Sequence, residues 1–147
     1  MRAGLLGGCA ILVMAAGLAL GWNRLSEQPL GLFETPVGLG VISLAEAQGH
    51  FRERRAVFVD ARSPRAFARG HIPGAVSLPP ARFEAVFPKI RSRFQPDRPV
   101  IVYCIGPRCP LAARLQPILR DQGYEVLLFR EGFAAWKAAG LPVEPGR

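Results

Sequence analysis

The run Pro99-Val100-Ile101-Val102-Tyr103-Cys104 is the most continuous apolar stretch of the chain beyond its N-terminal region. A short apolar run that begins at a proline and ends at a turn is typical of a central strand in a parallel sheet, which is buried on both faces. One glycine and two prolines within the next six residues predict a tight turn, and residues 111–122 then have the spacing of a helix. Cys104 is therefore expected where the central strand ends, a position at which parallel α/β sheets form their sites.

Strands and helices alternate on both sides of this run. Short apolar runs predict strands, and apolar residues spaced three or four apart predict helices. Pro88 is expected to divide the helical pattern between residues 81 and 94 into two short pieces. Such alternation predicts an α/β domain with a mainly parallel sheet. The predicted strands are 56–60, 75–78, 99–103 and 125–129, and the predicted helices are 44–51, 65–69, 111–122 and 133–139, besides the two pieces within 81–94.

The N-terminal region has a different character. Residues 3–22 carry no charged side chain and are long enough to cross a bilayer as one helix. We expect this segment to anchor the protein in the membrane, in a bacterial inner membrane with the domain facing the periplasm. The alternative is a secretory signal peptide with a small-residue cleavage site at 19–21, whose removal would release the domain.

These observations divide the chain into four parts. Residues 1–23 form the transmembrane anchor or uncleaved signal. Residues 24–40 are rich in glycine and proline and show no sustained period, as expected of a tether. The folded domain is expected at 41–143, followed by a short tail at 144–147.

Composition limits the partners. The formal net charge is +8, from 17 arginines and 2 lysines against 11 acidic residues. These cations are scattered and not interleaved with aromatic residues, which argues against nucleic acid as a partner. They suit a small anion or an acidic membrane surface. The 3 cysteines exclude a four-thiolate zinc site and a dense disulfide framework.

The loop after the central strand has the residues of an anion-binding nucleophile. A cysteine at a strand end faces the free backbone N–H groups of the following helix, which favour a thiolate. Gly106 lets the backbone bend around the sulfur, and Arg108 adds a positive charge. On these residues alone, Cys104 serves either as a nucleophile or as a buried thiol that only packs.

Five motifs follow one another along the chain: Val59-Asp60-Ala61-Arg62, residues 67–79 (FARGHIPGAVSLP), Val102-Tyr103-Cys104, Gly123-Tyr124 and residues 131–143 (EGFAAWKAAGLPV). In this order they resemble the landmarks of a single rhodanese domain over residues 41–143. The resemblance implies a three-layer fold, with a five-stranded mainly parallel sheet and helices on both faces. It implies a thiosulfate sulfurtransferase-like enzyme that needs no metal or organic cofactor.

The resemblance also assigns the site. Cys104 matches the catalytic cysteine, which takes sulfur from a small anionic donor such as thiosulfate and passes it, as a persulfide, to a thiol or cyanide. Asp60 and Arg62 match supporting residues at a strand end, and His71 matches a turn residue rather than a general base. The active-site loop corresponds to Ile105, Gly106, Pro107, Arg108 and Cys109.

The loop departs from the commoner family pattern in its length. The family has glycine three positions and a basic residue five positions after the cysteine, whereas Gly106 and Arg108 come at two and four. Pro107 and Pro110 also lack an N–H group that could face the sulfur. Related phosphatases need arginine six positions after the cysteine, where this chain has Pro110, so phosphatase activity is not expected.

Cys109 is the second departure. It is either an unreactive residue near the helix start, or a partner of Cys104 in a disulfide or as a resolving thiol. The alternatives to a sulfurtransferase are therefore a Cys104/Cys109 redox or sulfur-relay element and a non-catalytic rhodanese-like module that binds a partner. The sequence identifies no protein partner.

Overall fold

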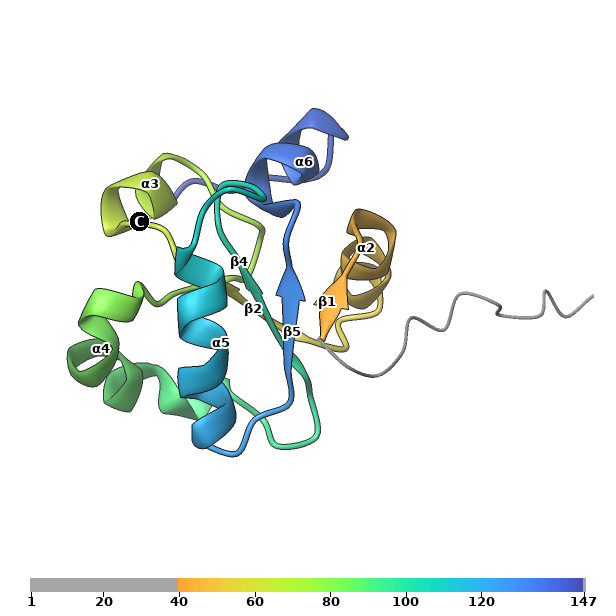
Figure 1. Ribbon diagram of the computed structural model, residues 1–147. Coiled ribbons are helices and arrows are strands. Elements are labelled where there is room, and N and C mark those ends of the chain that lie inside the picture. Colours follow the sequence, from red (N-terminus) through yellow and green to blue (C-terminus); the bar gives the residue numbers. More distant parts are fainter. Residues whose placement is uncertain (1–39, 147) are drawn as a thin grey trace, which may run out of the picture. The chain divides into compact units, whose positions relative to one another are not determined.

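Five parallel strands form one sheet in the computed structural model, which describes residues 40–146. The strand order is β1-β5-β4-β2-β3, so that β4 lies at the centre (Figure 1). The run that begins at Pro99 is thus confirmed as the central strand. The strands are β1 (Val41–Ile42), β2 (Val57–Asp60), β3 (Val76–Ser77), β4 (Val100–Tyr103) and β5 (Val126–Phe129).

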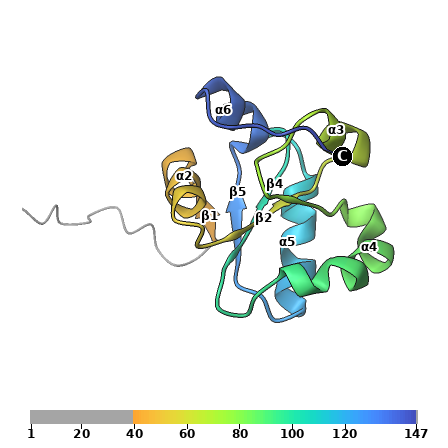
Figure 2. The same cartoon turned by 180° about the vertical axis from the view of Figure 1, so that it is seen from behind.

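Helices cover both faces of the sheet. Helices α2 and α6 pack on one face, and α4 and α5 pack on the other (Figures 1 and 2). The expected five-stranded α/β fold with helices on both faces is therefore confirmed. The helices are α2 (Leu44–Arg52), α3 (Pro64–Arg69), α4 (Phe83–Ile90), α5 (Leu111–Asp121) and α6 (Gly132–Ala138), with 3₁₀ turns η1 (Pro80–Arg82) and η2 (Arg91–Arg93).

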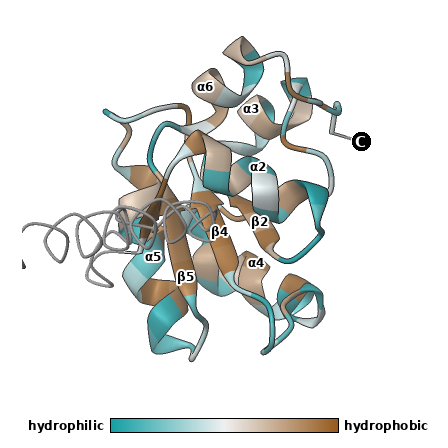
Figure 3. Cartoon of the chain, turned by 90° about the vertical axis from the view of Figure 1, so that its right-hand side faces the viewer, coloured by the Kyte–Doolittle hydropathy of each residue, from teal (hydrophilic) through white to brown (hydrophobic). Residues whose placement is uncertain are grey.

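The central strand joins two apolar cores. Val100 and Val102 contribute to the core under α4 and α5, whereas Ile101 and Tyr103 contribute to the core under α2 and α6. All four side chains are completely buried. Figure 3 shows the same arrangement, with the most apolar colouring on the strands between the helices. The continuous apolar run is explained by this position, because successive side chains of a strand point to opposite faces.

The predicted break at Pro88 is wrong. Helix α4 continues through Pro88 to Ile90, and the 3₁₀ turn η2 follows. Phe83 and Phe87 are buried and their rings stack with centroids 4.7 Å apart. A proline inside a helix costs about 3 kcal/mol, and burying two phenylalanines contributes roughly 1.5–3 kcal/mol each. Packing on the core thus outweighs the local preference.

The other predicted elements are confirmed to within two residues at each end. Strand β1 was not predicted from periodicity, because its two residues are too short to show one. It pairs with β5 through Val41 opposite Leu128 and Ile42 opposite Phe129.

Residues after α6 remain in contact with the domain. Trp136 donates its indole N–H to the Pro142 carbonyl oxygen at 2.8 Å. Glu144, in the predicted tail, exchanges two backbone hydrogen bonds with His71, at 2.9 and 3.0 Å. The end of the described chain is thereby held against the turn that precedes β3.

Among residues 40–146, no helix combines the length and the apolar character that a membrane crossing requires. The expected anchor at 3–22 and almost all of the expected tether at 24–40 lie outside the residues that the structure describes.

We predict that Ser43→Ala lowers the free energy of unfolding by about 1 kcal/mol at neutral pH. Ser43 caps α2 and forms a reciprocal pair of hydrogen bonds with Glu46. The hydrogen bonds from Ser43 lower the pKa of Glu46 below its ordinary value of 4.5. The contribution of ionised Glu46 is therefore complete above that value and is lost as the pH falls through the lowered pKa.

Urea unfolding of the two proteins at about pH 7 and about pH 3 measures this effect. The difference in the free energy of unfolding between wild type and Ser43→Ala should be smaller at the lower pH. A difference that stays the same would contradict the role of the Glu46 carboxylate.

Candidate active site

The sheet brings the predicted site residues to one edge. Strands β2 and β4 are parallel neighbours, and Asp60 lies opposite Tyr103 in their register. Cys104 follows directly after β4 and is only 3% exposed. The ends of the two strands are further joined by a 2.9 Å hydrogen bond from Ala61 N–H to the Tyr103 carbonyl oxygen. Asp60 and Cys104 thus both lie at the carboxyl edge of the sheet.

The shortened loop is a tight turn. The N–H of Cys109 donates to the Gly106 carbonyl oxygen at 3.0 Å, which closes a four-residue turn over Gly106–Cys109. Pro107 occupies the second position of this turn, where its fixed φ is favoured and its missing N–H is not needed. The turn directs Cys109 back toward Cys104.

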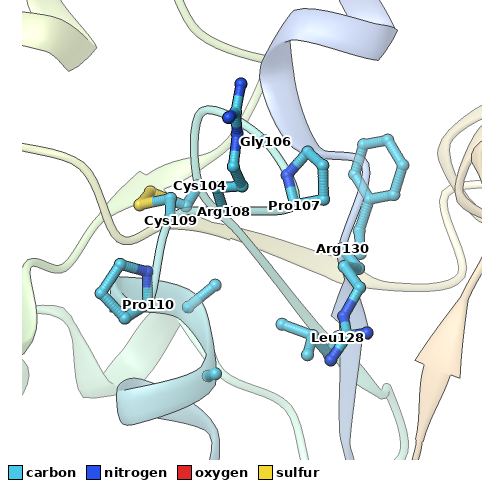
Figure 4. Close-up of a pocket in the computed structure, with 11 residues that line it drawn as sticks. Cys104, Gly106, Pro107, Arg108, Cys109, Pro110, Leu128 and Arg130 are labelled. Atoms are coloured by element: carbon cyan, nitrogen blue, oxygen red, sulfur yellow. A yellow bond between two sulfur atoms is a disulfide. The ribbon is translucent and has the colours of Figure 1, made fainter.

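The two cysteines form a disulfide, with their Cα atoms 6.2 Å apart (Figure 4). The structure therefore holds the oxidised form of the loop, in which Cys104 has no free thiol. Cys109 is half-buried and thus more accessible than Cys104.

Backbone donors remain available in the loop. The N–H groups of Ile105, Gly106 and Arg108 form no hydrogen bond with any residue in the described range 40–146. Pro110 precedes α5, and its lack of an N–H group suits the start of a helix. Three amide N–H groups of the loop are therefore unpaired among the described residues, despite its two prolines.

Helix α6 holds the loop from the other side. The N–H of Phe133 donates to the Cys104 carbonyl oxygen at 2.8 Å, and the N–H of Ala134 donates to the Ile105 carbonyl oxygen at 2.9 Å. Gly132 makes this close approach feasible, because it adopts a left-handed φ of +66°. A Cβ atom there would overlap the Cys104 carbonyl oxygen and lie 2.9 Å from the Gly106 nitrogen.

Asp60 and Arg62 form a buried ion pair beside the loop. The Arg62 Nη2 donates to Asp60 Oδ2 at 2.6 Å and to the Gly70 carbonyl oxygen at 2.7 Å. The Arg62 Nε donates to both carboxylate oxygens, at 2.9 and 3.0 Å. The guanidinium also lies 4.0 Å from the ring centroid of Phe133, within range of a cation–π interaction. Arg62 thus connects Asp60 at the end of β2 with Phe133, whose N–H binds the Cys104 carbonyl oxygen.

Tyr103 is the last residue before Cys104 and is kept neutral. Burial, and then the neighbouring Asp60 carboxylate, raise the pKa of Tyr103 far above its ordinary value of 10. Its hydroxyl oxygen accepts a hydrogen bond from the N–H of Ile72 at 3.2 Å. Tyr103 therefore joins β4 to the turn before β3.

His71 lies in that turn, as expected, and is buried. Its ring stacks on Phe67 with centroids 3.6 Å apart. One ring nitrogen contacts the Phe67 carbonyl oxygen and the other contacts the Glu144 carboxylate, each at 3.1 Å. Both nitrogens are thus used within the turn and its contact with the end of the chain.

A cavity of about 220 Å³ lies beside the loop, at the start of α5 and the end of β5. Arg108 and Arg130 are its charged lining residues, so the charge of the lining is entirely positive. Arg130 was not predicted as a site residue from the sequence, although its place directly after a predicted strand was a usable signal. In Figure 4 the cysteine sulfurs and Arg130 lie on opposite sides of the loop. The volume is below the usual range for drug-sized ligands and suits a small anion.

Comparison with known proteins agrees with the fold. The family model of the rhodanese-like domain matches residues 43–139, and the chain belongs to this family. A protein named sulfurtransferase from Allochromatium vinosum is 38% identical over 89 residues, which are 59% of this chain and 77% of that protein.

Two further relatives are larger than this chain. An HTH-type transcriptional regulator of Mycobacterium tuberculosis is 33% identical over 105 residues, and the match covers 71% of this chain but only 45% of the regulator. The structure of a thiosulfate sulfurtransferase from Pseudomonas aeruginosa is similar with a TM-score of 0.60 and 30% identity. That similarity covers 74% of this chain and 21% of the Pseudomonas protein.

We predict that Arg62→Met lowers the free energy of unfolding by about 3–5 kcal/mol, because it leaves the Asp60 carboxylate buried without a counter-charge. The double variant Asp60→Asn/Arg62→Met removes both charges, and its free energy of unfolding should fall by less than that of the single variant. Urea unfolding of the three proteins measures both differences. A single variant at least as stable as the double variant would show that the buried charge is not what the pair compensates.

We predict that Gly132→Ala destabilises the protein by about 1–2 kcal/mol for the left-handed backbone, and by more for the overlap with the Cys104 carbonyl. Gly140→Ala is the matched control, because Gly140 has a φ of +67° and open space where a Cβ would lie. Thermal unfolding of both variants separates the two effects. An equal loss of stability in Gly132→Ala and Gly140→Ala would contradict the close contact between α6 and the loop.

Proposed function

We propose that the protein is a sulfurtransferase that carries sulfur as a persulfide on Cys104. The Cys104 thiolate attacks the outer sulfur of a thiosulfate-like donor. A bond forms between the Cys104 sulfur and that outer sulfur, the sulfur–sulfur bond of the donor breaks, and sulfite leaves with the electron pair. A thiolate or cyanide then attacks the outer sulfur of the persulfide and releases the Cys104 thiolate.

The observation that carries this proposal is the position of Cys104 in a loop with unused donors. Its sulfur follows the central strand, and three backbone N–H groups of the same loop lack an acceptor among the described residues. Donors fixed by the protein stabilise an anion without the cost of reorganising solvent. A thiolate, a persulfide anion and the departing sulfite are all anions, so the same donors serve every step.

Charge around the cavity supports the same substrate class. Arg108 and Arg130 are exposed, and neither forms an ion pair within residues 40–146. A small divalent anion such as thiosulfate would be attracted to both. The relatives named as sulfurtransferases from Allochromatium and Pseudomonas support the reaction type.

The oxidised loop adds one requirement. Cys104 is bonded to Cys109, so a reductant must open the disulfide before Cys104 can attack a donor. We therefore expect the isolated protein to be inactive toward thiosulfate until it is reduced.

The test uses a Cys109→Ser variant, in which Cys104 cannot return to the disulfide. After reduction and removal of the reductant, thiosulfate should release one equivalent of sulfite and increase the mass of the protein by one sulfur atom. Cyanide should then remove that sulfur as thiocyanate. Mass spectrometry and sulfite assay follow both steps.

The double variant Cys104→Ser/Cys109→Ser is the matched control and should take up no sulfur. Absence of sulfur uptake by Cys109→Ser would overturn the proposal. If that variant still bound thiosulfate or sulfite without reacting, the non-catalytic binding module would be the better reading.

A further inference from the structure

The disulfide joins the proposed sulfur carrier to a second thiol of the same loop. We propose that Cys109 is a resolving residue that displaces the carried sulfur from Cys104 as hydrosulfide. The protein would then convert a sulfane sulfur donor into sulfide, with its own two thiols as the reductant. This inference rests on the proposed persulfide at Cys104.

The step balances without an outside oxidant. The Cys109 thiolate attacks the inner sulfur of the persulfide, Sγ of Cys104, and a bond between the two Sγ atoms forms. The bond between Cys104 Sγ and the outer sulfur breaks, and that sulfur leaves with the electron pair and its proton as HS⁻. The carried sulfur gains two electrons, which the two cysteine thiols supply as they become a disulfide.

The geometry favours attack on the inner sulfur. The turn closed by Cys109 N–H and the Gly106 carbonyl returns the chain over the strand end. The Cα atoms of the two cysteines are 6.2 Å apart, within the range of about 4.4–6.8 Å that a disulfide spans without backbone movement. The product of the proposed step is therefore the bond that this loop already accommodates.

The shortened loop determines where the second thiol lies. Pro107 and Arg108 alone separate the two ends of the four-residue turn, and Cys109 is the residue on which the turn closes. An additional residue before Cys109 would move that side chain away from the turn position it now holds. The feature that sets this loop apart from the commoner family pattern is thus the feature that brings the second thiol to the first.

Accessibility determines how the disulfide is reopened. Cys109 is half-buried, whereas Cys104 is 3% exposed, so an incoming thiolate reaches Cys109 first. A mixed disulfide then forms on Cys109 and the Cys104 thiolate is released as the next nucleophile. Arg108, adjacent to Cys109 and exposed, attracts an anionic thiolate to this sulfur.

The same order of events selects the reductant. A monothiol bound to Cys109 can be expelled by Cys104, which restores the original disulfide. A reductant with two neighbouring thiols resolves the mixed disulfide with its second thiol before this happens. The partner is therefore a dithiol, and the cycle consumes one dithiol for each sulfide released.

The test is a single turnover of the full chain carrying Cys9→Ser, so that the two loop cysteines are its remaining thiols. The protein is reduced, the reductant is removed under anaerobic conditions, and one equivalent of thiosulfate is added. We expect one equivalent each of sulfite and sulfide, loss of both thiols, and a Cys104–Cys109 disulfide by peptide mapping. Cys109→Ser in the same background should release sulfite, keep the sulfur on Cys104 and yield no sulfide.

A second measurement compares reductants under turnover. With the protein that has both loop cysteines, dithiothreitol should support at least about tenfold faster sulfide production than 2-mercaptoethanol at equal thiol concentration. The Cys109→Ser variant should show a much smaller difference, because either thiol attacks its persulfide directly.

The outcomes separate this inference from the function on which it rests. One outcome is that the Cys9→Ser protein and its Cys109→Ser variant both release sulfite and yet keep the Cys104 persulfide for the same time. In that case the resolving role is wrong and the sulfurtransferase proposal stands. If neither protein releases sulfite, both proposals fail. Release of sulfide by the Cys109→Ser variant in the absence of added thiol would also overturn the resolving role.

Discussion

The buried ion pair between Asp60 and Arg62 is the constraint around which the site is arranged. Both side chains are almost completely removed from water, so the charges must satisfy each other and their remaining hydrogen bonds within the protein. Arg62 does so by contacting three segments: the end of β2, the Gly70 carbonyl oxygen and the ring of Phe133. Since the N–H of Phe133 binds the Cys104 carbonyl, the ion pair and the loop share one support.

That support gives the short loop a defined shape. The first turn of α6 holds the carbonyl groups of Cys104 and Ile105, whereas the N–H groups of Ile105, Gly106 and Arg108 have no partner among the described residues. A loop fixed by its carbonyl groups and open at its amides suits an anion. The tight turn from Gly106 then places Cys109 against Cys104, so the proposed anion site and the second thiol arise from the same few residues.

Local sequence patterns predicted most of the fold because the elements are strongly patterned. The run at Val100–Tyr103 is buried on both sides, and Ser43 and Ser63 cap the helices expected after them. Prediction was wrong at Pro88, where buried phenylalanines hold one helix together. It missed β1, whose two residues form a strand only because β5 lies beside them.

The sequence by itself determined the order of elements, the family resemblance and the place of Cys104 at the end of the central strand. These follow from the period of apolar residues and from motif spacing, which are local properties. Only the tertiary structure decided that the loop closes as a turn on Cys109, that Arg130 joins Arg108 at the cavity, and that Glu144 binds His71. Each of these depends on residues brought together by the sheet or by a turn, and distances across a fold are not encoded in spacing along the chain.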